Sequence, residues 1–273
     1  MFAAPVFFET FWLPRPVDAL AVVADSFHLK PLLRVTQSAD RFHVLLLTKT
    51  SARLFEGNRY ELHRVDRPGE LPEYRAAVGT DPAQSDRMHP DRNVEQFFRA
   101  VDAAVLDRYS HRDGLPVVLA AIPDNASEFR KLSKNPHLVE EGVIKDPGTM
   151  ALPDLRAAAW EVIQPRYTAR LAGLTDKFRG ALAHGLAAAD PKEVGPAIVM
   201  NRVGTLLVDA DRLLPGTVDP ATGAVTPAPA DAPGVDDLLD DLAELTLKTG
   251  GEVVVVPADR MPTQTGLAAV YRF

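Results

Sequence analysis

The sequence FHVLLLTKTSARLFEGNRYELHRV, residues 42–65, contains three apolar segments in close succession. Residues 42–49 form a run of buried type, and residues 52–57 and 60–65 follow it after short polar breaks. Short apolar runs bounded by turn residues are typical of β-strands. Gly57-Asn58 is predicted to form a two-residue hairpin turn between the last two strands. The stretch therefore predicts a three-strand meander.

Helices alternate with strands after this meander. Residues 66–92 contain four prolines and no apolar period, which indicates a long loop. A helix follows, whose start resembles a capping box formed by Asn93 and Gln96. A strand over residues 116–122 and a helix over residues 125–134 come next. The predicted helix carries one apolar stripe at helical spacing, formed by Val94, Phe97, Phe98, Val101 and Val105.

The second half of the chain also reads as alternating helices and strands. Residues 153–189 predict one or two helices with a break at Pro165, and a strand is expected over residues 204–208. Residues 215–234 hold five prolines and three glycines, which favours a disordered or flexible loop. A helix from Val235, ended by Gly250, and strands over residues 253–256 and 267–271 complete an α/β layer.

Composition excludes several kinds of chemistry. The 273 residues include no cysteine, so disulfides, thiol nucleophiles and cysteine zinc sites are absent, in keeping with a cytoplasmic protein. The net charge of −7 repels phosphate backbones, so that any nucleic-acid contact requires a local basic patch. Residues 195–273 carry five basic and eleven acidic residues, which makes that part a poor surface for phosphate.

The apolar N-terminus, FAAPVFFETFWL at residues 2–13, is interrupted by Pro5 and Glu9. It has no basic start, so it predicts neither a signal peptide nor a membrane span. Two interpretations stay open: a first strand docked in a sheet, or a chain that begins inside a domain whose upstream part is absent. A short apolar strand is expected further on, over residues 19–23.

Common catalytic and metal-binding motifs are absent from the sequence: no GxGxxG, Walker loop, HExxH or GxSxG occurs. We therefore predict no cofactor, no catalytic residue and no metal site. The acidic run on the last helix is assigned to dipole pairing and a solvent face, and Asp209 and Asp211 to a loop. The seven histidines lack metal-ligand spacing and are expected at surfaces or strand ends: His28, His43, His63, His89, His111, His137 and His184.

Basic residues gather in two places. The segment SEFRKLSKN places Arg130, Lys131 and Lys134 within two turns, with the first and last on one helix face. Arg87 and Arg92 lie near the start of the Phe97 helix, whose N-terminus favours an anion. A solvated face is the simpler interpretation, and a phosphate-contacting patch is the functional one.

The order of elements and several strings resemble the bacterial relatives of the archaeo-eukaryotic release factor and Pelota superfamily. These strings are FHVLLLTKTSARLFEGNRYEL, FRKLSKNPHLVEEG, GTLLVDAD and LLDDLAELTLKTGGEVVVVPADRMP, and the resemblance covers roughly residues 15–273. It implies an α/β (α+β) fold in which a ribonuclease-H-like middle domain precedes a C-terminal α/β domain similar to kink-turn-RNA-binding proteins. The domains expected are an N-terminal tail and linker (1–37), the middle domain (38–165), a helical connector (166–194) and the C-terminal domain (195–273).

Release factors of this superfamily carry a Gly-Gly-Gln loop, and the resemblance places its equivalent at residues 78–85, VGTDPAQS. Gly79 and Gln84 are present, but Pro82 and Ala83 directly precede the glutamine. Proline and a Cβ remove the backbone freedom that such a loop uses. Peptidyl-tRNA hydrolysis is therefore not expected, as in Pelota-like rescue factors. Nuclease activity is not expected either, because the predicted strands lack clustered carboxylates.

These observations leave three alternative hypotheses for the function. The first is a non-catalytic, ribosome-associated translation factor that contacts rRNA or tRNA through Gly79, Gln84, Arg87, Arg92, Arg130, Lys131 and Lys134. The second is an enzyme acting on RNA or a nucleotide, which needs two of Glu56, Asp91, Asp102 and Asp124 to converge on a metal. The third is an interaction scaffold that forms a homodimer or binds a protein through Phe7, Phe11 or Trp12.

Overall fold

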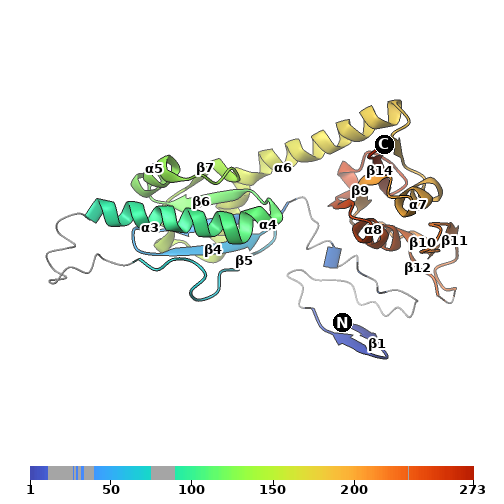
Figure 1. The fold of residues 1–273 in the computed structure, drawn as a ribbon, viewed down its shortest axis with the longest axis horizontal. Coiled ribbons are helices and arrows are strands. Elements are labelled where there is room, and N and C mark those ends of the chain that lie inside the picture. Colours follow the sequence, from blue (N-terminus) through green and yellow to red (C-terminus); the bar gives the residue numbers. More distant parts are fainter. Residues whose placement is uncertain (12–26, 28, 30–31, 34–39, 75–89, 233) are drawn as a thin grey trace. The chain divides into compact units, whose positions relative to one another are not determined.

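The computed structural model describes residues 1–11, 27, 29, 32–33, 40–74, 90–232 and 234–273 (Figure 1). The chain forms two compact units, one of residues 40–166 and one of residues 1–39 together with 167–273. The four segments expected from the sequence stay a prediction. No helix within the described part of the chain is long and apolar enough to cross a membrane.

The N-terminal residues form a small hairpin. Strand β1 (Phe2–Ala4) pairs antiparallel with β2 (Phe7–Glu9), and the two form a sheet of their own. Phe7 is 44% exposed and Phe11 is 41% exposed, while the rings of Phe2 and Phe7 contact Phe27. Trp12 and the strand predicted over residues 19–23 lie outside the described residues.

The middle unit is built on a five-stranded mixed sheet in the order β5-β4-β3-β6-β7 (Figure 1). The first three strands form the antiparallel meander that the sequence predicted, and β3 runs parallel to β6, which runs parallel to β7. Strand β7, in which Glu140, Glu141 and Ile144 are exposed, was not predicted as a strand. The bounds are β3 (Phe42–Leu47), β4 (Ala52–Gly57), β5 (Leu62–Arg64), β6 (Val117–Ala121) and β7 (Leu138–Ile144).

The turn between β4 and β5 differs from the predicted one. Gly57 belongs to β4, and the turn consists of residues 58–61, closed by a hydrogen bond from the Asn58 N–H to the Glu61 carbonyl oxygen. The Asn58 side-chain oxygen accepts hydrogen bonds from the N–H groups of Tyr60 and Glu61. This asparagine therefore organises a four-residue turn, so the prediction of a two-residue turn at Gly57-Asn58 was wrong.

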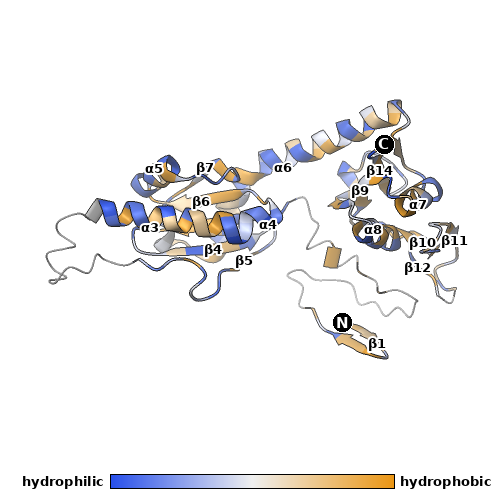
Figure 2. Cartoon of the chain, viewed as in Figure 1, coloured by the Kyte–Doolittle hydropathy of each residue, from blue (hydrophilic) through white to orange (hydrophobic). Residues whose placement is uncertain are grey.

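Helices cover the middle sheet. The predicted apolar stripe is confirmed on α3 (Pro90–Val105), where all five of its residues are buried. Figure 2 shows apolar and polar residues alternating along this helix. The helix begins at Pro90, so Asn93 lies inside it and the predicted capping box was wrong. The chain continues through η1 (Leu106–Ser110) and α4 (His111–Asp113), and α5 (Pro123–Leu132) follows β6.

A single long helix, α6 (Leu152–Ala183), follows the short turn η2 (Pro147–Thr149). It runs through Pro165, so the predicted break was wrong. Proline removes one backbone hydrogen bond, but burial on both sides of it holds the helix: Ile163 is 2% exposed and Leu171 is 4% exposed. The boundary between the two units lies one residue beyond Pro165, between residues 166 and 167.

The C-terminal sheet has the order β13-β9-β14-β8 (Figure 1). Leu206 and Val255 face a core shared with helices α7 (Pro191–Val199) and α8 (Leu238–Lys248), while Leu207 and Val254 face Leu171 and Phe178 of α6. Alternate residues of each strand thus point to opposite faces of the sheet, and both faces are buried. The bounds are β8 (Ala187–Ala188), β9 (Val203–Asp209), β13 (Glu252–Val256) and β14 (Leu267–Tyr271), with η3 (Ala258–Arg260) between the last two.

The segment over residues 215–234, predicted to be disordered or flexible, contains regular structure. Strands β10 (Pro215–Val218), β11 (Val225–Pro227) and β12 (Asp236–Asp237) form a sheet in the order β11-β10-β12. The Asp219 carboxylate accepts hydrogen bonds from two backbone N–H groups of the turn, and Gly223 takes a φ of 72°. These residues form the turn that joins β10 to β11 in a hairpin. Proline and glycine content alone does not reveal such a turn.

The acidic run on α8 has two roles. Asp237 caps the helix by accepting a hydrogen bond from the Leu239 N–H, so α8 begins at Leu238 and the predicted start at Val235 was wrong. Gly250 takes a φ of 70° after the helix end, as predicted. Asp240, by contrast, is 1% exposed, and its carboxylate accepts a hydrogen bond from the Leu29 N–H at 2.5 Å. The predicted solvent face was therefore wrong for this residue.

Candidate functional site

Some of the residues predicted to contact a ribosome lie in the described part of the chain, and others do not. Gly79, Gln84 and Arg87 lie outside the described residues. Arg92 is exposed in the first turns of α3, where the unpaired N–H groups of the helix favour an anion. It is therefore available for contact with a phosphate.

Arg130 is engaged within the fold. Its Nη1 donates a hydrogen bond of 2.6 Å to the Val139 carbonyl oxygen, and its Nη2 is buried without a hydrogen-bond partner among the described residues. Burial lowers the pKa of its guanidinium, against the opposing effect of Glu141 and Glu140. The side chain therefore joins α5 to β7, which reduces its availability to an external phosphate.

Lys131 and Lys134 are exposed at the end of α5. The helix ends at Leu132, so Lys134 lies beyond it and the predicted shared helix face with Arg130 does not exist. The Lys134 N–H donates a hydrogen bond of 2.7 Å to Asp102 Oδ2, while Ser133 Oγ donates one of 2.5 Å to Asp102 Oδ1. Asp102 thus fixes the backbone that presents Lys134.

The carboxylates named for a metal-dependent enzyme do not form a common group among the described side chains. Asp102 is used in the contacts above, and Glu56 lies instead beside two residues that the sequence did not group with it. The Asp91 side chain is not described. Within the described part of the chain, His43, Glu56 and Asp113 bring one potential ligand atom each within 4.8 Å of the other two.

This cluster lies where β3, β4 and the end of α4 meet. His43 is the second residue of β3 and Glu56 is its direct partner on β4, so the two side chains project from the same face of the sheet. Asp113 ends α4, and Gly114 follows it with a φ of 63°. His43 Nε2 lies 3.7 Å from Glu56 Oε2 and 3.7 Å from Asp113 Oδ2.

The cluster combines a fully buried histidine with two partly buried carboxylates. The His43 side chain is 0% exposed, so of the two positions expected for a histidine it takes the strand end and not the surface. Arg41 donates to Glu56 Oε1 from Nε at 3.0 Å and from Nη2 at 2.6 Å. Burial alone raises the pKa of Glu56, but the interactions with His43 and Arg41 outweigh it and lower this pKa to about 2.

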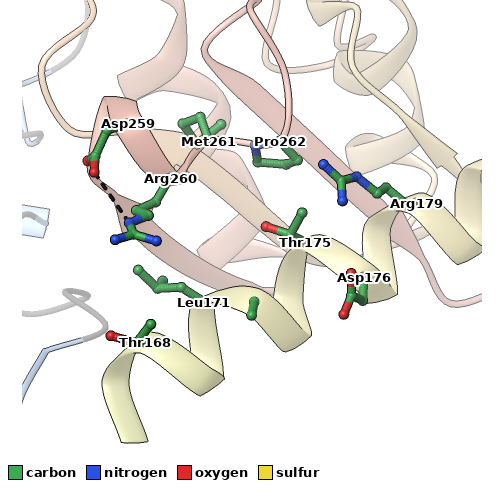
Figure 3. A pocket seen from close by; sticks show the side chains of 10 residues that line it. Thr168, Leu171, Thr175, Asp176, Arg179, Asp259, Arg260, Met261 and Pro262 are labelled. Atoms are coloured by element: carbon green, nitrogen blue, oxygen red, sulfur yellow. Dashed lines mark ion pairs between the residues drawn. The ribbon is translucent and has the colours of Figure 1, made fainter. Parts of the chain in front are cut away.

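A pocket of about 300 Å³ lies in the C-terminal unit (Figure 3). Residues of α6, from Thr168 to Arg179, line one side, and residues 259–262 line the other. Asp176 and Asp259 offset Arg179 and Arg260, and Asp259 forms an ion pair with Arg260. Because its charges balance, this pocket favours neither an anion nor a cation.

Several solved structures match this chain. A model of ribosome-bound archaeal Pelota and ABCE1 matches 89% of this chain at 20% identity with a TM-score of 0.53. Dom34 of S. cerevisiae, a translation termination-like factor, matches 85% of the chain at 13% identity with a TM-score of 0.46, over 63% of its own length. The archaeal termination factor aRF1 matches 90% at 18% identity with a TM-score of 0.35, over 66% of its own length.

The Pelota likeness confirms the predicted fold class, a ribonuclease-H-like middle domain followed by a C-terminal α/β domain. The chain spans 66% of the Pelota chain, slightly less than two thirds of it. No curated protein matches the sequence. The model of the bacterial archaeo-eukaryotic release factor family 3 matches residues 41–202, more than half of the chain. The resemblance read from residues 42–65 and their surroundings is thereby confirmed, and the chain belongs to the bacterial archaeo-eukaryotic release factor family 3.

Proposed function

We propose that this protein is a cytoplasmic, ribosome-associated translation factor that acts by binding. The family match over residues 41–202 is the observation that carries the proposal. The likeness to a Pelota chain that is ribosome-bound supports it, since the same middle and C-terminal folds recur here.

Residues 78–85, VGTDPAQS, support action by binding without hydrolysis. A loop that positions water at a peptidyl-tRNA ester needs a flexible backbone before its glutamine. Pro82 fixes its own φ and Ala83 adds a Cβ, so Gln84 lacks two preceding glycines. We therefore assign no hydrolytic role to this loop.

Contacts with RNA are assigned to exposed cations of the middle unit. Lys131 and Lys134 are exposed after α5, and Arg92 is exposed near the start of α3. Cations that contact phosphates contribute affinity without reading sequence. Gly79, Gln84 and Arg87 complete the proposed surface, and Arg130 supports it by holding β7 against α5.

Co-sedimentation of the purified chain with bacterial ribosomes tests the association. We expect the protein to pellet with ribosomes, and the double variant Lys131→Glu/Lys134→Glu to pellet less. The matched control is Lys177→Glu/Lys192→Glu, which makes the same charge change at exposed residues of the other unit. The logarithm of the binding constant falls as the logarithm of the salt concentration rises, and each lost phosphate contact makes this slope less steep by about 1. Failure to co-sediment with empty, translating or stalled ribosomes would overturn the proposal.

A release assay tests the absence of hydrolysis separately. Ribosomes carrying formyl-methionyl-tRNA are incubated with the protein, and free formyl-methionine is measured. We expect release no faster than the background rate. Release that disappears in Gln84→Ala would refute the binding-only mode while leaving ribosome association intact.

A further inference from the structure

The His43 imidazole is a buried polar group whose ring nitrogens have no hydrogen-bond partner among the described residues. The side chain is 0% exposed. Buried side-chain nitrogens are nearly always paired with protein or another ligand, and an unpaired one requires an explanation. The groups facing Nε2 supply that explanation.

Two carboxylate oxygens, Glu56 Oε2 and Asp113 Oδ2, each lie 3.7 Å from His43 Nε2. This separation is too long for a hydrogen bond. Zinc lies about 2.0–2.1 Å from a histidine nitrogen and about 2.0–2.2 Å from a carboxylate oxygen, which places two tetrahedral ligand atoms roughly 3.4 Å apart. A shift of about 0.3 Å in each of the two histidine–carboxylate pairs therefore brings those atoms to ligand spacing. The two carboxylate oxygens lie within 4.8 Å of each other.

Other contacts hold the ligand groups in place. Arg41 occupies Glu56 Oε1, and the Leu115 N–H donates to Asp113 Oδ1 at 3.3 Å, so each carboxylate keeps one oxygen toward His43. The backbone N–H of His43 donates a hydrogen bond of 2.8 Å to the Pro116 carbonyl oxygen, which fixes the start of β3. Metal sites use such outer contacts to orient their ligands.

We propose that His43, Glu56 and Asp113 bind a divalent transition-metal ion of the zinc class through Nε2, Oε2 and Oδ2. Three protein ligands leave a fourth position for water or for a group of a partner molecule. An imidazole ligand favours zinc over magnesium, which prefers an octahedral shell of oxygens. The assignment goes beyond ribosome binding and differs from the expectation that no histidine of this chain is a metal ligand.

Two arginines set the charge around the ion. Arg41 donates to Glu56 Oε1 and offsets part of the cluster's negative charge, while Oε2 stays toward His43. Arg112 Nη2 lies 3.5 Å from Asp113 Oδ2, and its side chain is 67% exposed, so it can move into solvent when the metal binds. The cluster thus presents two carboxylate oxygens and an imidazole nitrogen to a cation.

The test uses full-length, tag-free protein that has been treated with a chelator and dialysed. Zinc binding is measured by isothermal titration calorimetry, and the bound metal is counted by mass spectrometry after gel filtration. We expect one zinc ion per chain and no saturable binding of magnesium at the same concentrations. Cobalt should give the visible absorption of a four-coordinate site.

Isosteric variants assign the ligands. Loss of an outer contact already weakens metal binding by about 10–100-fold, so we expect Glu56→Gln and Asp113→Asn each to weaken zinc binding at least about tenfold. His184→Asn is the control, because this exposed histidine belongs to the other unit. Circular dichroism verifies that each variant folds. Absence of zinc binding by the folded wild type, or equal affinity in wild type, Glu56→Gln and Asp113→Asn, would refute the site.

Discussion

Replacing Arg130 by alanine tests whether this residue supports the fold or serves as a contact for RNA. Its Nη1 hydrogen bond to the Val139 carbonyl oxygen joins α5 to β7, and Gly142 on the same strand packs against its Nη2. We expect Arg130→Ala to destabilise the middle unit. We expect Lys131→Ala, which removes the neighbouring exposed base, to leave stability unchanged within about 0.5 kcal/mol.

The magnitude follows from two opposing effects. A hydrogen bond from a charged donor contributes about 1.5–3 kcal/mol, and alanine also loses the packing of the arginine stem. Removing the guanidinium recovers about 1 kcal/mol, because Nη2 is buried without a partner among the described residues. The net loss is about 1–2 kcal/mol in the free energy of unfolding. With a urea m-value of about 2 kcal/mol/M, the midpoint falls by about 0.5–1 M.

Tryptophan fluorescence during urea unfolding measures this change. The chain has two tryptophans, and in a Trp12→Phe background the remaining one, Trp160, stacks against Phe42 in the middle unit. The same proteins are then compared in ribosome co-sedimentation. The reasoning fails if Arg130→Ala keeps the wild-type midpoint but sediments less with ribosomes, because Arg130 would then be a contact residue.

Three further predictions concern stability. Phe98 is 0% exposed, so Phe98→Ala should lower the free energy of unfolding in urea by about 3–5 kcal/mol. Phe8 is 67% exposed, so Phe8→Ala should lower it by under about 0.5 kcal/mol. Equal midpoints for the two variants would contradict the assigned core. Gly223→Ala should lower the melting temperature more than Gly234→Ala, since both residues have positive φ but only a Cβ at Gly223 collides with the α7 backbone; similar losses would contradict this packing. Because the folded pKa of Glu56 is about 2 and its unfolded value is 4.5, its ionised form stabilises the fold fully above about pH 5 and progressively less toward pH 2. This shift contributes up to about 3.4 kcal/mol to the stability difference between wild type and Glu56→Gln. The difference should therefore shrink over that range in chemical denaturation, and a constant difference would contradict the lowered pKa.

Local patterns predicted the elements in which neighbouring residues share one environment. The apolar runs of residues 42–65 became three paired strands, and the stripe from Val94 to Val105 became the buried face of α3. The stop at Gly250 followed from backbone groups within one turn of that residue. Periodicity and capping act over a few residues, so a sequence displays them directly.

Predictions were wrong where distant residues override a local preference. Pro165 favours a break, but packed residues on both sides keep α6 continuous. The prolines and glycines of residues 215–234 favour disorder, but pairing with β12 gives the hairpin a fixed place in a sheet.

The sequence by itself determined the strand meander, the apolar helix faces and the family resemblance, because each is a pattern along the chain. Only the tertiary structure brought ligand atoms of His43, Glu56 and Asp113 within 4.8 Å of one another, since strand register and the end of α4 decide which of their atoms meet. It also decided that Arg130 binds a buried carbonyl oxygen while Lys131 stays exposed. Residues next to each other in sequence point in different directions on a helix, so burial against a neighbouring strand separates their roles.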